Sequence, residues 1–450
     1  MNVLAKRGSE GAAMKMLQDL ENKYDELQTF DLRPNSVSFN ICLSALSRNP
    51  TKENLMKAES LLDRMQTLSE NGNPEVSPDS FSMNSILSAW ANSNIDGAAQ
   101  RTESILQHMQ HMYENGNKRL KPTVVAFASV LHAWARTGVV ERAEAIVDHM
   151  EQLSDLKGYT ELRPNTIIYN TLMNSFAKKG GKDAETKAEA VLSKMEALSA
   201  KGIKEAKPSR ISYNIVLAAY HRNAGLDTLR KGRKILDRME SETCTEIQPD
   251  VVTYTTYIKL LAKCRHPGVI VEVERIVTLM EKKALAGDRY ARPNNFTYDT
   301  ILRMCAGMCA GQIQHDLEMK RKALLLAVKT MAKFQDAVHI QPTSLSYKFF
   351  IMSVNRLSAG NERLALLERS LQDCCQDGRL SNGIIDMLKH GNGHELLFSA
   401  LNYSGSIEKL NVQQLPKRWS RKAGRSLPSL SSQRQRVRVK HQHGRGRLKK

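Results

Sequence analysis

The chain has 450 residues, of which 41% are hydrophobic and 25% charged, and its formal net charge is +19. The hydrophobic fraction is sufficient for a folded core, and no run of 18 apolar residues that could span a membrane occurs. The seven cysteines are odd in number and lie mostly on segments with helical patterns, which indicates reduced thiols rather than the disulfide framework of a secreted protein.

One phrase recurs eight times along the chain. It consists of a proline, a small polar residue, three mostly apolar or hydroxyl residues and an aromatic residue, usually followed by Asn, as in residues 164–170. Successive prolines are 44, 44, 42, 44, 41, 44 and 49 residues apart. A near-fixed period of this length is typical of a solenoid of structural repeats.

Each repeat predicts two helices. After Pro164, apolar residues at i, i+3, i+4, i+7 and i+8 from Tyr169 predict a short helix A, which Gly180 and Gly181 end. A second apolar series over residues 188–198 predicts a longer helix B with Lys and Glu on its other faces. One such hairpin cannot bury its apolar face alone, so neighbouring hairpins must stack. The predicted fold is all-α, a right-handed α-solenoid of helix-turn-helix repeats with a disordered basic C-terminal tail.

The chain begins with residues 1–35, a partial repeat whose helix B pattern covers residues 12–27. Too few residues precede this pattern for a helix A, so we expect a truncated start, and no targeting leader is visible. Seven complete repeats and an eighth, degenerate repeat with its helix B over residues 362–375 are expected next. The repeats cover residues 36–79, 80–123, 124–165, 166–209, 210–250, 251–294, 295–343 and 344–378.

The composition changes after the repeats. Capping helices over residues 381–389 and 394–401 are expected within 379–412, followed by a tail over 413–450. Residues 417–450 contain thirteen Lys or Arg and no Asp or Glu, so the tail should be disordered when free. Its composition fits a solvated tail or sorting signal as well as a non-specific clamp on nucleic-acid phosphate.

The repeated phrase resembles the pentatricopeptide repeat. Residues 249–254 and 169–172 match its helix A, and residues 143–150 match its helix B. The resemblance covers about residues 12–378, as a P-type-like array whose repeats are longer than the family's, with the extra residues at helix ends. It implies an α-solenoid that binds single-stranded RNA in a eukaryotic organelle, a mitochondrion in preference to a plastid, at one base per repeat.

Two positions of each repeat are candidates for contact with the bases. Numbered from the second residue after the proline, positions 2 and 5 lie on one face of helix A, distinct from the core stripe that begins at position 4. An apolar side chain beside an amide or hydroxyl suits an unstacked base, which offers a ring for contact and an edge for hydrogen bonds. The resemblance assigns base stacking to position 2, which holds Val37, Phe81, Val125, Ile167, Ile211, Val252, Phe296 and Leu345.

The resemblance also assigns base reading to position 5 together with the residue after the next proline, with the RNA running 5′ to 3′ along the repeats. These pairs are Asn40 with Asp79, Asn84 with Thr123, Ala128 with Asn165, Asn170 with Ser209, Asn214 with Asp250, Thr255 with Asn294, and Asp299 with Thr343. In order, they resemble pairings for uracil, a pyrimidine, an unassigned base, cytosine, uracil, adenine and an unassigned base. The expected site is 5′-U-Y-N-C-U-A-N-3′, and the eighth position 5, Lys348, matches no pairing.

Structural roles compete with this interpretation. Position 2 could pack against the neighbouring repeat, and the residue after proline belongs to the set that caps helix N-termini. Position 5 is harder to explain by structure alone, because Asn inside a helix costs roughly half a kcal/mol relative to Ala.

Enzymatic functions find little support in the sequence. His394 and Glu395 lack the Cys-x-x-Cys partner of the family's deaminase domains, and Cys305 and Cys309 fit core thiols better than a zinc site. We therefore predict a non-catalytic, monomeric RNA-binding adaptor without cofactor, metal or membrane contact, with RNA-processing or ribosomal proteins as further candidate partners. The alternatives are a helical scaffold that holds proteins in an irregular groove and a factor bound to an organellar ribosome.

Overall fold

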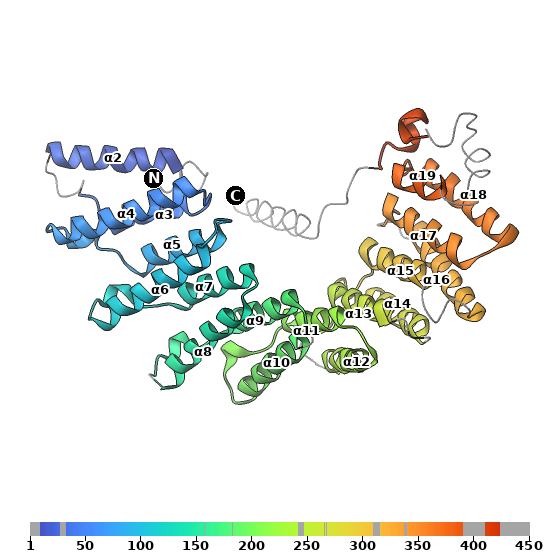
Figure 1. Ribbon diagram of the computed structural model, residues 1–450, viewed down its shortest axis with the longest axis horizontal. Coiled ribbons are helices and arrows are strands. Elements are labelled where there is room, and N and C mark those ends of the chain that lie inside the picture. Colours follow the sequence, from blue (N-terminus) through green and yellow to red (C-terminus); the bar gives the residue numbers. More distant parts are fainter. Residues whose placement is uncertain are drawn as a thin grey trace, which may run out of the picture. The chain divides into compact units, whose positions relative to one another are not determined.

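The computed structural model describes residues 10–27, 33–156, 158–181, 183–241, 247–264, 266, 268–308, 316–336, 340–389 and 410–423. It divides into two compact units, Met1–Asn223 with Cys244–Ile247, and Ala224–Thr243 with Gln248–Lys450. The secondary structure of these described ranges is helical, without a strand, and each unit is a stack of helical hairpins, the architecture of an α-solenoid (Figure 1). None of the described helices is long and apolar enough to cross a membrane.

The first unit starts with a single helix B, α2 (Glu10–Leu27). Four hairpins and one further helix A follow. They are α3 (Ser36–Leu46) with α4 (Lys52–Glu70), α5 (Ser80–Asn92) with α6 (Ala98–Glu114), α7 (Val124–Thr137) with α8 (Val140–Leu156), α9 (Thr166–Lys179) with α10 (Ala184–Ala200), and α11 (Arg210–Arg222). Each helix A packs on its own helix B and on the next helix A, so the A helices form a continuous row.

The second unit repeats this arrangement. It starts with α12 (Leu226–Ser241), the helix B of the fifth repeat. The hairpins that follow are α13 (Val251–Cys264) with α14 (Val269–Leu285), α15 (Asn295–Gly307) with α16 (Leu317–Asp336), and α17 (Ser344–Leu357) with α18 (Gly360–Gln376), closed by α19 (Asn382–Lys389). The A helices α13, α15 and α17 pack in sequence, and α19 packs on α17.

Every helix A begins two residues after its proline because the intervening residue caps it. The side-chain oxygen of the capping residue accepts a hydrogen bond from the backbone N–H three residues later, as from Ser82 to Asp79 at 2.9 Å and from Thr297 to Asn294 at 3.0 Å. A cap of this kind contributes about 1 kcal/mol. The same bond forms at Asn35, Thr123, Asn165, Asp250 and Thr343.

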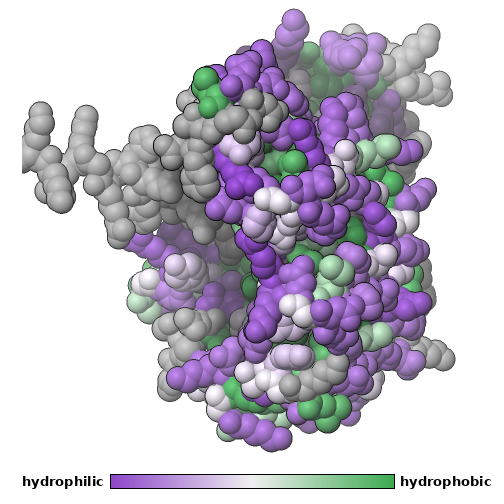
Figure 2. All heavy atoms as spheres, turned by 90° about the vertical axis from the view of Figure 1, so that its left-hand side faces the viewer, coloured by the Kyte–Doolittle hydropathy of each residue, from purple (hydrophilic) through white to green (hydrophobic). Residues whose placement is uncertain are grey.

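The predicted core stripe of the fourth repeat is buried. Tyr169, Leu172, Met173 and Phe176 are all less than 5% exposed. Helix α9 ends at Lys179, and Gly180 follows with a φ of 68°, a backbone conformation that favours glycine. In the view of Figure 2, hydrophilic side chains dominate the surface and apolar residues form separate patches, as expected when the apolar stripes face neighbouring helices.

In several repeats, a tyrosine at position 4 links helix A to the helix B before it. The phenol of Tyr169 donates to Glu151 at 2.8 Å, and that of Tyr213 donates to Glu196 at 3.0 Å. Both glutamates directly follow the buried methionine of helix B. Tyr298 makes the equivalent bond to Glu281 at 3.3 Å. These bonds join successive repeats, in addition to the burial of the rings.

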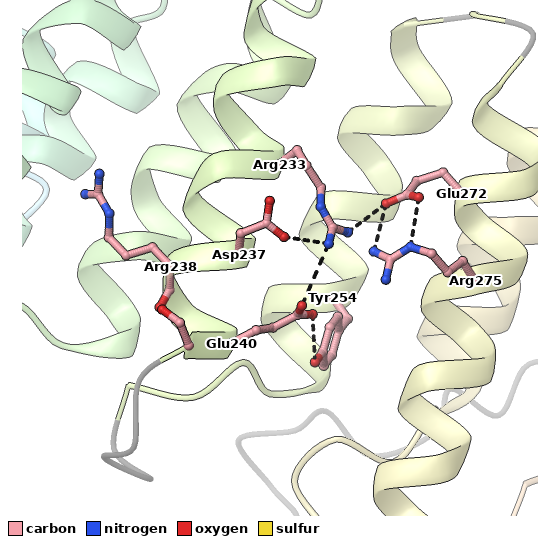
Figure 3. Close-up of polar contacts among 8 residues, drawn as sticks. Arg233, Asp237, Arg238, Glu240, Tyr254, Glu272 and Arg275 are labelled. Atoms are coloured by element: carbon pink, nitrogen blue, oxygen red, sulfur yellow. Dashed lines mark hydrogen bonds and ion pairs between the residues drawn. The ribbon is translucent and has the colours of Figure 1, made fainter.

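An ion-pair network adds to this link in the second unit (Figure 3). Arg233 of α12 pairs with Asp237 of the same helix and with Glu272 of α14 at 2.9 Å. Arg275 holds the other side of the Glu272 carboxylate, and Glu240 accepts from the phenol of Tyr254 at 3.4 Å. Burial raises the pKa of Glu272 and of Glu240, and the Arg233 guanidinium opposes both shifts. The network connects α12, α13 and α14 through partly buried charges.

Part of the additional length of the repeats forms a short turn before the proline. Four of these turns are 3-10 helices, at Pro74–Val76, Lys118–Leu120, Thr160–Leu162 and Lys204–Ala206. Each places an apolar residue two positions before the proline into the core, namely Val76, Leu120, Leu162 and Ala206. The inserted residues therefore lie outside the row of A helices, as their position at helix ends predicts.

The folded part of the chain includes residues that the composition assigns to the disordered tail. Residues 413–423, which the prediction assigns to a disordered tail, pack on the last repeat. The backbone N–H of Leu380 donates to the Trp419 carbonyl, and that of Lys422 donates to the Gly378 carbonyl, both at 2.9 Å. Backbone pairing of this kind leaves no compositional signal. The predicted helix over 394–401, the basic residues from 424 to 450 and Cys309 lie outside the described residues.

Candidate nucleic-acid interface

The apolar side chain at position 2 is solvent-exposed in all eight repeats. The exposed fraction runs from 40% at Val252 to 67% at Ile167. The other members are Val37, Phe81, Val125, Ile211, Phe296 and Leu345. Single exposed apolar residues are ordinary, but a column of eight at one structural position is not expected of a surface that faces only water. The competing structural explanation was that position 2 packs against the neighbouring repeat. The structure does not bury these side chains in this way.

Position 5 lies beside this column and is more buried. In the first pair, Nδ2 of Asn40 donates to both carboxylate oxygens of Asp79 at 3.3 Å. In the second pair, the Thr123 hydroxyl donates to Oδ1 of Asn84 at 3.2 Å. These two predicted pairs are therefore in direct contact, although Asp79 and Thr123 also cap their helices. Capping and contact with position 5 coexist in the same side chain.

A third position, which the sequence interpretation did not include, contacts position 5. The hydroxyl at position 3 of the next repeat donates from Ser82 to Oδ1 of Asn40 at 2.6 Å, and from Ser346 to Oδ1 of Asp299. Thr297 lies 2.9 Å from Thr255 in the same arrangement. The sequence does contain a signal, because position 3 is Ser or Thr in six of the eight repeats.

The remaining pairs differ. Thr255 and Asp299 are linked through position 3 and not directly to Asn294 and Thr343. Ala128 has no polar group to offer Asn165. Asn214 belongs to the first unit and Asp250 to the second, so their pairing stays a prediction.

Asn170 and Asn214 differ from the other position 5 asparagines. The Oδ1 atom of each is buried, and within the described part of the chain it has no hydrogen-bond partner. The hydroxyl of Ser209, the predicted partner of Asn170, lies 3.3 Å from the hydroxyl of Ser212 instead. An unsatisfied buried amide oxygen costs roughly 1 to 3 kcal/mol, so these two amides are less firmly held than that of Asn40.

A basic column also lies on this face of helix A and was missed from the sequence. Position 13 follows position 2 by eleven residues, three turns of helix, and so points in nearly the same direction. Arg222 donates to the Lys178 carbonyl at 2.7 Å, and Arg356 donates to the Ala306 carbonyl at 2.8 Å. Each thereby caps the C-terminus of the preceding helix A, which favours a cation. The column consists of Arg48, Arg136, Lys178, Arg222, Lys263 and Arg356, all in the most exposed class of residues.

Comparison with known proteins identifies the repeats. The family model of the pentatricopeptide repeat domain matches residues 104–179 and 234–308. These two segments of the chain are pentatricopeptide repeats. A search of the curated proteins finds no match.

Among solved structures, the pentatricopeptide repeat protein PPR10 in complex with an 18-nt psaJ RNA element is similar at 16% sequence identity and a TM-score of 0.37. The match covers 88% of this chain and 55% of PPR10. A cysteine-to-serine variant of PPR10 with the same RNA element gives the same values. The chain therefore spans about half the length of PPR10.

One position 5 side chain has a raised pKa. Burial raises the pKa of Asp299 from 3.8 to about 6, and the hydrogen bond from Ser346 opposes the rise. The folded state therefore binds this proton more tightly than the unfolded chain. The stabilisation is complete below pH 3.8 and is lost as the pH rises through 6.

We expect Asp299→Asn to remove this dependence. The variant keeps an oxygen that accepts from Ser346 but does not ionise, so its stability relative to the wild type should rise between pH 4 and pH 7, by at most about 3 kcal/mol. Urea unfolding of both proteins across this range measures the difference. A difference that stays constant with pH would contradict the assignment.

Proposed function

We propose that this chain binds single-stranded RNA in a sequence-specific manner, one base per repeat, on the face of helix A that carries positions 2, 5 and 13. In this proposal it is a non-catalytic adaptor in the processing, stabilisation or translation of organellar transcripts, in a mitochondrion in preference to a plastid. The observation that carries the proposal is the column of eight exposed apolar side chains beside polar side chains at position 5.

The geometry fits the chemistry of unstacked bases. An exposed Val, Ile, Leu or Phe offers contact to the face of a base, and the neighbouring amide, hydroxyl or carboxylate offers donors and acceptors to its edge. Phe296 also lies below the ammonium group of Lys259, which is 4.2 Å from the ring centre. A cation above the ring favours a stacked, phosphate-bearing ligand at this repeat.

Phosphate contacts are assigned to the basic column at position 13. Its side chains are exposed, and exposed cations attract a polyanion. Cation contacts supply most of the sequence-independent affinity for nucleic acid and make it depend on salt. The nine Lys and Arg residues of segment 424–450 are a second candidate source of such contacts.

The adjacent residues Ile167 and Ile168 provide a matched test. Ile167 is 67% exposed, whereas Ile168 is fully buried. Ile167→Ala should weaken binding to 5′-UUACUAA-3′ by about 1 kcal/mol, through lost apolar contact, which is roughly fivefold in Kd, without changing the melting temperature. Ile168→Ala should instead destabilise the fold by about 2 to 5 kcal/mol. Unchanged RNA affinity in a folded Ile167→Ala variant would contradict a role for position 2.

Ser209→Asp tests base reading. A carboxylate can accept the N3 proton of uracil, while a hydroxyl can donate to N3 of cytosine, so the variant should move the fourth base from C towards U by about 1 kcal/mol or more. Asp also caps helices well, so folding should be retained. Competition between 5′-UUACUAA-3′ and 5′-UUAUUAA-3′ measures the change. A preference for C that survives the substitution would mean that these columns are caps and core and not a code.

Deletion of residues 424–450 tests the tail. It removes nine cations and leaves Lys417–Trp419 and the segment that packs on the last repeat. The slope of log affinity against log salt should decrease by roughly 0.7 for each lost phosphate contact, while the sequence preference stays. An unchanged slope would exclude the tail from the binding surface.

A further inference from the structure

Position 4 is aromatic in seven of the eight repeats, and the exception is Met83 in the second repeat. The rings occupy the space between the preceding helix B and the helix B of their own repeat. Tyr298 donates to Glu281 of α14 and packs edge-on against Phe334 of α16, with ring centres 5.3 Å apart. Phe127 lies 5.9 Å from the ring of His149 in α8.

An open cavity lies where the second repeat lacks this ring. It has a volume of about 340 Å³ between α4, α5 and α6. Its walls include the apolar residues Leu62, Met83, Ile86 and Ile105. A second cavity of about 180 Å³ shares Leu62, Asp63, Met83 and His108 with the first and extends to Met112.

The next repeat shows that the missing ring accounts for this space. The second cavity is lined by Gln66, Pro78 and Leu120, and their counterparts one repeat later are Gln110, Pro122 and Leu162. There, with Phe127 at position 4, the corresponding cavity has a volume of about 20 Å³. Methionine in place of an aromatic side chain therefore leaves room for a ring.

We propose that this cavity is a binding site for a tyrosine side chain of a partner protein, at a place separate from the RNA-binding face. The other repeats show what fills such a space, namely a ring whose hydroxyl donates to an acidic side chain of the preceding helix B, as Tyr169 donates to Glu151 and Tyr213 to Glu196. In the second repeat, Asp63 of that helix B lines the cavity and is exposed at its rim.

The charges at the rim favour a protein over a nucleic acid. Asp63 and Glu59 both line the cavity, and its one arginine, Arg101, is held by Glu59 at 2.8 Å. Carboxylates beside a neutralised arginine repel a phosphate backbone, whereas they accept a hydrogen bond from a phenol. A tyrosine ring is also the side chain that most often combines apolar contact with one polar group at protein interfaces.

The test uses p-cresol as the probe and NMR of methyl-labelled methionines as the readout. Titration should shift the methyl signals of Met83 and Met112 saturably and leave those of Met150 and Met195, the buried methionines of other helices B, unchanged. Met83→Tyr fills the cavity from within and should abolish the shift at Met112. Met83→Phe serves the same purpose if the tyrosine variant does not fold. No saturable shift in the wild type, or an equal shift in a folded filled variant, would overturn the site.

Two further measurements test whether the ligand of the cavity is a protein tyrosine. Peptides from a library with a central Tyr should bind the wild type better than the same library with a central Leu, by about tenfold or more, and should not bind Met83→Tyr. The oligonucleotide 5′-UUACUAA-3′ should leave the p-cresol shift at Met112 unchanged. Equal binding of the two libraries, or displacement of p-cresol by the RNA, would overturn the assignment to a protein tyrosine.

Discussion

The arrangement of the repeats depends on one hydrogen bond, from a backbone N–H of the first turn of helix A to the side chain of the residue after proline. Proline prevents further helix and fixes the direction of the chain, and the cap then starts the next helix at the same residue in each repeat, as at Asp79 and Asn294. Because the start is fixed, the rotation of helix A about its axis is fixed too. Position 4 faces the core and position 2 faces solvent in every repeat for this reason.

The two faces of helix A therefore have different roles. One face buries rings such as Tyr169 and joins the repeat to the helix B before it, through bonds such as that to Glu151. The other face leaves apolar side chains such as Ile167 in solvent. This exposure costs free energy, so stability alone does not explain why these side chains are apolar. Such a cost, repeated eight times, is expected only where a ligand offsets it. Separation of the faces also lets the exposed side chain at position 2 vary without disturbance of the core.

Much of the fold follows from the sequence because proline, cap and apolar period are local signals. The end of α9 at Gly180 and the buried stripe from Tyr169 could be predicted in this way. Contacts between repeats could not, because they join residues about forty apart, such as Ser82 and Asn40. The order of residues 413–423 depends on backbone bonds, as between Leu380 and Trp419, which composition does not report. The cavity at Met83 was missed because a methionine satisfies the apolar pattern as well as a ring does.

The hydroxyl at position 3 shows that the proposed base-reading side chains and the start of helix A are not independent. Ser82 bonds both to the cap Asp79 and to the amide of Asn40, so a change at position 3 alters the helix start and the position 5 side chain together. The exceptions are consistent with this coupling. Where position 3 is Ile168, the preceding position 5 is Ala128, which requires no hydrogen bond. Where position 3 is Ala126, Asn84 obtains its bond from the cap Thr123 instead. Position 5 and the capping residue thus vary within limits that position 3 sets.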